Sequence, residues 1–425
     1  MECTRARAGR PQPHNPPAIG IHRTGTAETH ANRAASLAGR LDAGLHLHQD
    51  RLRRWSIAAL LTFLADLTLF NLYEVWVAIP RKLVESDFRI WYSAGLIGSR
   101  WGWQHLYDAD MMRRAVEMVW PGSRVLPFPN PPPAAWLMVP FTLLPFGPAL
   151  FLWTLLSLAL VVALSQAFAP PSSWARIAFA LSAFGFLPVF VMVEAGPLSP
   201  PVLLGIAGCV LLLRRGHQVA AGLVLSLILV KPNVAVLVPP ALLVAGQVRA
   251  FVAWLAPTAV MVVISVLTLG QHGLEGFVAV EMDFAGMGYY LTYSLADMLG
   301  GSAAYAIAVP IIVALTLVAA RVRRKSDPGL VVAAGVLGSL LINHHLTPAD
   351  FILLLIPVWV GVAQAQPRHR RVVSAGLWAA GWTTSLGLAW PVAVMELAYI
   401  AVLILPDRVR GGQVSQAVPE PSLHL

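Results

Sequence analysis

Long hydrophobic runs alternate with short polar turns along the chain from Trp55 to Leu405. A helix that crosses a bilayer needs about 20 consecutive apolar residues, and residues 55–79 form the first run of this length. We therefore predict an all-α, polytopic integral membrane protein with about 12 transmembrane helices, within a range of roughly 10 to 13. The later runs expected to cross or re-enter the membrane are residues 149–168, 176–193, 198–213, 217–247 (twice), 250–269, 302–320, 329–345, 350–366 and 372–405 (twice).

Polar stretches between these runs divide the chain. Residues 1–54 are rich in Arg and Pro with little apolar periodicity, which is typical of a disordered basic tail. A second tail is expected at 407–425, and a transmembrane domain at 55–406 lies between them. Two polar segments of this domain, 80–133 and 271–301, are expected to be large outer loops.

Composition supports the membrane interpretation. Only 12% of the 425 residues are charged and 57% are hydrophobic, whereas soluble proteins carry about 25% charged residues. The net charge of +9 indicates orientation rather than a nucleic-acid partner, because Lys and Arg concentrate in short cytoplasmic loops. We expect a multi-pass protein of the plasma (inner) membrane, with both termini cytoplasmic and the active site on the outer face.

Several common kinds of site are absent from the sequence. Cys3 and Cys209 form no CxxC pair and have no metal-ligand spacing. There is no Gly-rich phosphate loop and no aspartate pair of the kind that holds a metal with a nucleotide diphosphate. We therefore expect no cofactor, no metal and no nucleotide donor.

Polar groups of three distant segments fall together on the predicted outer face. An acid, a cation and histidines gathered there suggest a lipid-linked anionic substrate. Displacing the phosphate of a polyprenyl-phosphate sugar needs a carboxylate base for the acceptor hydroxyl and cations for the departing phosphate. Asp87 can be the base, with Glu85 as the alternative, and Lys231, Arg89 and a histidine can hold the phosphate. The segments are residues 85–89, 231–233 and 343–350.

Short motifs between residues 85 and 365 occur in a characteristic order. They are Asp87–Gly95, Leu106–Asp108, Phe128–Pro132, Pro140 with Leu144–Phe146, Leu229–Pro232 and His344-His345. The set resembles the membrane mannosyltransferases of glycosyltransferase family 87, which have the GT-C architecture and use polyprenyl-phosphate-mannose donors. The resemblance implies that Asp87 is the general base of an inverting transfer and that His344 and His345 lie at the donor phosphate.

Some candidate residues have a structural interpretation beside the chemical one. Tyr107 and Asp108 either position the acceptor or pack within the first loop, and Tyr293 is a candidate lid residue over the donor. Lys231 either contacts phosphate or extends its ammonium to the membrane interface. The histidine pair either binds phosphate or caps a helix, and no third ligand beside it suggests a metal.

Together these features predict an enzyme of the cell envelope, a GT-C-like membrane glycosyltransferase. It would transfer a hexose, expected to be mannose, from polyprenyl phosphate to a hydroxyl of a lipid-linked glycan or glycolipid with inversion. Its expected partners are the lipid-linked donor, the acceptor and membrane lipids, without nucleic acid. The alternatives are a transporter or flippase of lipid-linked sugars and an arabinofuranosyltransferase of the same fold.

Overall fold

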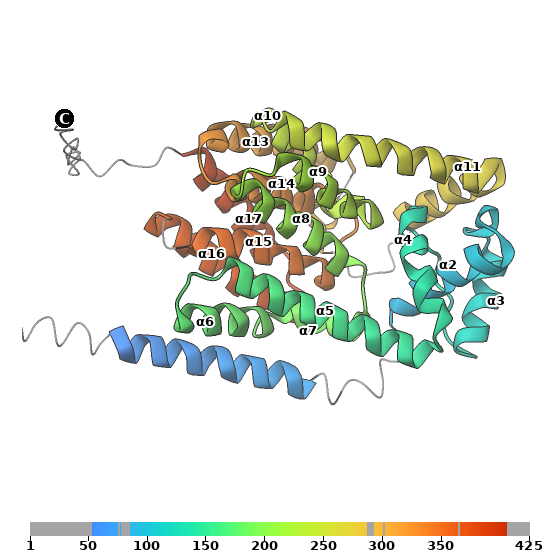
Figure 1. The fold of residues 1–425 in the computed structure, drawn as a ribbon, viewed down its shortest axis with the longest axis horizontal. Helices are drawn as coiled ribbons and strands as arrows, with labels where there is room; N and C mark the ends of the chain where they lie inside the picture. Colours follow the sequence, from blue (N-terminus) through green and yellow to red (C-terminus); the bar gives the residue numbers. More distant parts are fainter. Residues whose placement is uncertain are drawn as a thin grey trace, which may run out of the picture. The chain divides into compact units, whose positions relative to one another are not determined.

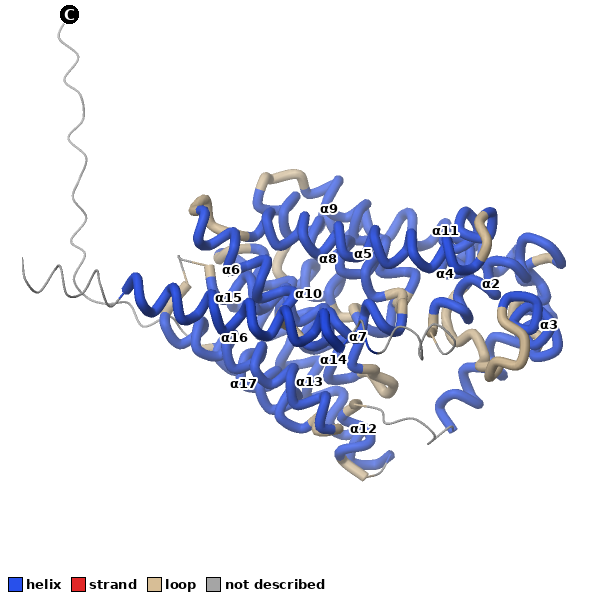
Figure 2. Tube along the Cα trace, turned by 90° about the horizontal axis from the view of Figure 1, so that it is seen from below, coloured by secondary structure: helices blue, strands red, loops and turns tan. Residues whose placement is uncertain are grey.

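The computed structural model describes residues 53–74, 77, 86–286, 293–300, 302–363 and 366–405. In this part of the chain every regular element is helical and no strand occurs, as predicted (Figure 2). Residues 1–52 and 407–425 of the predicted tails lie outside the described residues, as does the alternative base Glu85.

The described helices follow the predicted hydrophobic runs. The first helix, Arg53–Glu74, occupies most of the first predicted span. The later helices, with 3-10 helices labelled η, are α2 (Phe88–Trp101), η1 (Trp103–His105), α3 (Ala109–Val119), α4 (Pro132–Met138), η2 (Val139–Leu143), α5 (Phe146–Phe168), α6 (Ser173–Phe184), α7 (Leu187–Ala195), α8 (Ser199–Arg214), α9 (Gln218–Leu225), η3 (Ser226–Val230), η4 (Pro232–Val234), α10 (Val238–Val244), α11 (Val248–Gly286), α12 (Leu295–Met298), α13 (Ser302–Val322), η5 (Arg323–Lys325), α14 (Pro328–Ile342), η6 (Pro348–Leu354), α15 (Leu355–Val362), α16 (Arg368–Gly381), η7 (Trp382–Leu386) and α17 (Trp390–Ile404).

The number of long apolar helices is smaller than the number of predicted spans. Among the described residues, four helices are long and apolar enough to cross a membrane, or up to five if α6 and α7, which meet at 55°, form one bent span. Other predicted spans consist of shorter apolar helices interrupted by 3-10 turns, such as α9 with η3 and η6 with α15. The expected count of about 12 crossings is therefore not confirmed.

Both segments predicted as large loops contain helices. The first holds α2 and α3, and the second contains α12 and the last part of α11, which continues to Gly286. Gly270 interrupts α11 with φ 60° and ψ −171°, a backbone conformation open essentially to glycine alone. The chain therefore changes direction at Gly270 and resumes the helix, where the sequence pattern suggested a loop.

The helix α14 lies at the centre of a bundle with α10, α13 and α17 (Figure 1). Its residues from Gly329 to Leu341 are all buried, as expected for a helix that is apolar on every side. A Cβ on Gly335 would lie 2.7 Å from Val238 Cα, so α10 packs directly against the α14 backbone. This packing fixes the position of the segment that follows Ile342.

A second group of helices, α2, α3 and α4, lies beside the C-terminal part of α11 (Figure 1). The start of α2 is anchored by Phe88, which is fully buried. Its ring lies 5.9 Å from that of Trp153 and 6.0 Å from that of Phe146, both in α5. The residue just before Phe88 is therefore held at a defined place.

Candidate active site

A cavity of about 940 Å³ lies where distant segments of the chain meet. Its lining includes Asp87, Lys231, His344 and His345, four residues singled out by the sequence. The other lining residues are Ile90, Trp91, Arg124, Leu126, Pro127, Pro129, Asn130, Pro131, Pro232, Asn233, Phe277, Glu281, Tyr293, Thr347 and Pro348. The structure thus brings the three predicted polar segments into one space.

Asp87 stands at the N-terminus of α2 with its carboxylate free of a capping role. Its carbonyl accepts a hydrogen bond from Ile90 N at 2.8 Å, while its side chain makes no capping hydrogen bond. Burial is the main cause that raises the pKa of Asp87, and the negative charge of Asp350 adds to it; with the opposing effects of Lys231 and Arg89 included, the pKa is about 6. A carboxylate with this pKa is a better proton acceptor near neutral pH than an ordinary aspartate.

Lys231 is buried at the cavity wall with a specific counterion. Its ammonium lies 2.5 Å from Oδ1 of Asp350, which also accepts a hydrogen bond from Ser199 Oγ at 2.8 Å. The other carboxylate oxygen of Asp350 accepts from the backbone N–H and the hydroxyl of Thr347, both at 3.1 Å. The network thus holds Lys231 at a fixed position beside the cavity.

The histidine pair lies in the turn between α14 and η6. The side chain of Asn343 shapes this turn, because its Oδ1 accepts from His345 N at 3.1 Å and from Asn233 Nδ2 at 3.3 Å. His344 is exposed and His345 is partly buried. Burial and the neighbouring charge of Lys231 lower the pKa of His345. At neutral pH this imidazole is therefore uncharged and can act as a hydrogen-bond donor.

Tyr293, the predicted lid residue, lines the cavity with a buried ring. Its hydroxyl donates to the carbonyl of Thr384 at 3.0 Å, and its backbone N–H donates to Leu346 O at 3.1 Å. Tyr293 is therefore tied to the turn that carries the histidines.

The other three predicted site residues lie behind the lining residues. Arg89 is buried and donates from Nη2 to the carbonyl of Arg124 at 2.8 Å. Tyr107 donates to the carbonyl of Asn130 at 2.8 Å. Through these bonds both residues support the cavity wall, since Arg124 and Asn130 line it. The third, Asp108, contacts two histidines outside the cavity lining.

Sequence reasoning missed several residues of the site. Arg124, Asn130 and Glu281 line the cavity without having been proposed as site residues. Asp350 lies in the predicted polar segment 343–350, but its pairing with Lys231 was not predicted. A usable signal existed, because a lysine between apolar runs needs a buried counterion.

The profile of glycosyltransferase family 87 matches residues 128–344, about half of the chain. The chain belongs to glycosyltransferase family 87. As a family 87 protein with several apolar helices, it is a multi-pass membrane glycosyltransferase. The matched region includes Lys231 and ends at His344, whereas Asp87 and Asp350 lie outside it. Searches of curated proteins and of solved structures found no match.

Proposed function

We propose that this family 87 enzyme transfers mannose from polyprenyl phosphate to a hydroxyl of a lipid-linked glycan or glycolipid, with inversion at the anomeric carbon. One observation carries the proposal: a single cavity contains the Asp87 carboxylate together with Lys231, His344 and His345. A base and a set of phosphate ligands in one space are the requirements of glycosyl transfer from a phosphate.

In the proposed reaction Asp87 accepts the proton of the acceptor hydroxyl as its oxygen bonds to the anomeric carbon. The bond between that carbon and the phosphate oxygen breaks on the opposite face, which inverts the configuration. The departing polyprenyl phosphate keeps the bonding electrons, and the ammonium of Lys231 with the N–H groups of the histidines stabilises its negative charge.

The candidate phosphate ligands differ in their charge and in whether they line the cavity. The charge of Lys231 is balanced by Asp350, and His345 is neutral at pH 7 because its pKa is lowered. Arg124 lines the cavity, and its backbone carbonyl is held by Arg89. We therefore assign Arg89 an indirect part in phosphate binding, through the Arg124 segment, in place of direct contact.

The remaining predicted residues suit the acceptor side. Tyr107 supports the wall at Asn130, Asp108 follows Tyr107 in the chain, and the ring of Tyr293 lines the cavity near the histidine turn.

The donor would enter laterally from the plasma membrane at its outer face, and both chain termini would be cytoplasmic. A donor that arrives through the lipid agrees with the lack of a nucleotide-binding motif in the sequence.

The test uses the purified full chain with polyprenyl-phosphate-mannose or polyprenyl-phosphate-arabinose, each with a glycolipid acceptor. Mass analysis should show a hexose added to the acceptor only with the mannosyl donor. A pentose adduct would replace the proposal by arabinofuranosyl transfer. An intact donor that only changes leaflet in sealed vesicles would replace it by lipid-linked sugar transport.

A further inference from the structure

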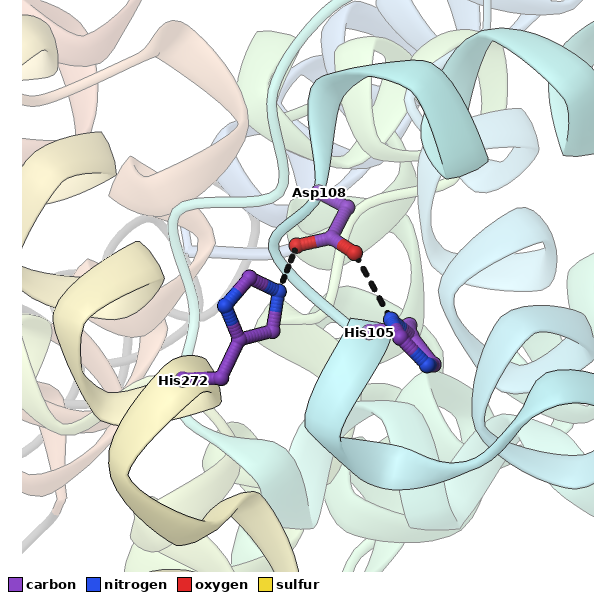
Figure 3. A group of neighbouring side chains, drawn as sticks. All are labelled: His105, Asp108 and His272. Carbon is purple, nitrogen blue, oxygen red and sulfur yellow. Dashed lines mark hydrogen bonds and ion pairs between the residues drawn. The ribbon is translucent and has the colours of Figure 1, made fainter.

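A second cluster of polar side chains lies outside the cavity lining. Nδ1 of His105, at the end of η1, lies 2.8 Å from Oδ2 of Asp108, the residue before α3. Nε2 of His272, in α11, lies 2.8 Å from Oδ1 of the same carboxylate. Figure 3 shows both imidazoles directed at Asp108 from opposite sides. Their three nearest ligand atoms all lie within 4.8 Å of one another.

Close backbone packing holds the two halves of this cluster together. A Cβ on Gly273 would lie 3.2 Å from the carbonyl oxygen of Gln104, and one on Gly276 would lie 3.0 Å from Tyr107 Cβ. These glycines let α11 lie directly against the segment that carries His105 and Asp108. The side chains are therefore placed by the fold, although 164 residues separate Asp108 from His272.

We propose that His105, Asp108 and His272 bind a divalent transition-metal ion, with Zn²⁺ as the best match. Two imidazole nitrogens and one carboxylate oxygen are a frequent zinc ligand set, completed by a water molecule. Zinc–nitrogen bonds of about 2.0 Å place two tetrahedral ligand atoms roughly 3.3 Å apart. The observed separations need only small side-chain adjustments to reach this arrangement.

The accessibility of the cluster suits reversible binding. The side chains of His105, Asp108 and His272 are 32%, 26% and 62% exposed, so an ion can enter from solvent. Without an ion, the two imidazoles engage the carboxylate by hydrogen bonds or ion pairs. An ion would replace both contacts by coordinate bonds, with each neutral imidazole carrying its single proton on the nitrogen that does not bind the ion.

The ion would lie outside the cavity and would connect the two segments that carry the lining residues Asn130 and Phe277. The ring of Tyr107, next to Asp108, lies 5.1 Å from that of Phe277, and its hydroxyl bonds to the Asn130 carbonyl. Phe277 and Asn130 both line the cavity. We assign the ion a positioning role, since its ligands lie outside the cavity lining.

The experiment titrates the metal-stripped full chain with Zn²⁺ in competition with a chromophoric chelator. Because residues 1–52 contain further histidines, the decisive quantity is the difference between wild type and H272A. We expect wild type to bind one more Zn²⁺ than H272A, or to bind it roughly 100-fold more tightly. The exposed His217, before α9, provides the matched control H217A, which should bind as wild type.

Two further measurements do not depend on glycosyl transfer. Zn²⁺ should raise the midpoint of thermal unfolding of wild type and H217A, but not of H272A or D108N. X-ray absorption of the zinc-loaded wild type should show two imidazoles and an oxygen ligand that H272A loses. Equal zinc binding and equal thermal shifts in wild type and H272A would overturn the proposal.

Discussion

The ammonium of Lys231 lies 2.5 Å from the carboxylate of Asp350, a residue 119 positions further along the chain. Asp350 is fully buried and is fixed in turn by Ser199 and Thr347. Lys231 is therefore an oriented donor at the cavity wall, and the free energy of folding depends on both partners of the pair.

Removing the negative partner should destabilise the protein. Asp350→Asn leaves a buried ammonium without its counterion, which typically costs about 3–5 kcal/mol of the free energy of unfolding. Denaturant unfolding in detergent measures this. Asp110→Asn is the matched control, because it weakens the exposed Arg113–Asp110 pair and should cost at most about 1 kcal/mol. Equal stability of the two variants would contradict the structural role of the Lys231–Asp350 pair.

Replacing the proposed base should remove transfer and leave the fold intact. Asp87→Asn keeps the size of the side chain but cannot accept the proton, so kcat should fall about 10²- to 10⁴-fold. Glu281 also lines the cavity, and Glu281→Gln should retain kcat within a few-fold. Single-turnover transfer assays on both variants decide between them. Near-normal transfer by Asp87→Asn would exclude this residue as the base.

The pH dependence of transfer should report Asp87. Because its pKa is raised to about 6, the base is protonated and inactive below that pH. We expect kcat/KM to rise about tenfold per pH unit up to pH 6 and to level off above it. A profile that is flat down to pH 4.5 would mean that the base has an ordinary aspartate pKa.

The neutral state of His345 leads to a distinct prediction. An uncharged imidazole contributes an N–H group, so His345→Gln should retain part of the activity by supplying an amide donor. His345→Ala removes the donor and should lower kcat about 10²- to 10³-fold, the usual effect of losing such a group. Kinetics of both variants at pH 7.5 provide the check, and equal losses would argue against hydrogen-bond donation.

Tyr107 should affect the acceptor through the cavity wall. Tyr107→Phe loses the hydrogen bond to the Asn130 carbonyl and about 1 kcal/mol of stability, and it should raise the KM for the acceptor. Tyr92→Phe is a matched control, because Tyr92 donates a similar 2.8 Å bond to the carbonyl of Leu144, which is not among the residues that line the described cavity, whereas Asn130 is. It should lose similar stability without a change in KM. Identical KM values would confine Tyr107 to packing.

The hydrophobic pattern predicted the positions of the helices well, because a long apolar run forms where the side chains are buried or in contact with lipid. It did not predict where helices break, since the 3-10 turn at Ser226–Val230 and the kink at Gly270 depend on tertiary packing. This explains why positions of helices were predicted better than the number of crossings.

Residues of the candidate site could be predicted where a charged side chain occurs in an apolar part of the sequence. Lys231 stood out as a charge between apolar runs, and the structure places it in the cavity with Asp87. Arg89 and Arg124 could not be distinguished by sequence, because only the fold shows which one lines the cavity. The approach of His272 to Asp108 was equally hidden, since it depends on the course of α11 after Gly270.

The kink in α11 bears on how the proposed lipid-linked donor would reach the cavity. Gly270 divides its 39 residues, and the 22 residues before the kink rise about 33 Å at 1.5 Å per residue, against about 30 Å of hydrocarbon in a bilayer. The part before Gly270 is therefore long enough to cross the hydrocarbon by itself, and the part after the kink carries the cavity residues Phe277 and Glu281. With the proposed polyprenyl-phosphate donor, the lipid chain would stay dissolved in the bilayer while its sugar reaches the cavity. Enzyme and donor would find each other by lateral diffusion in two dimensions.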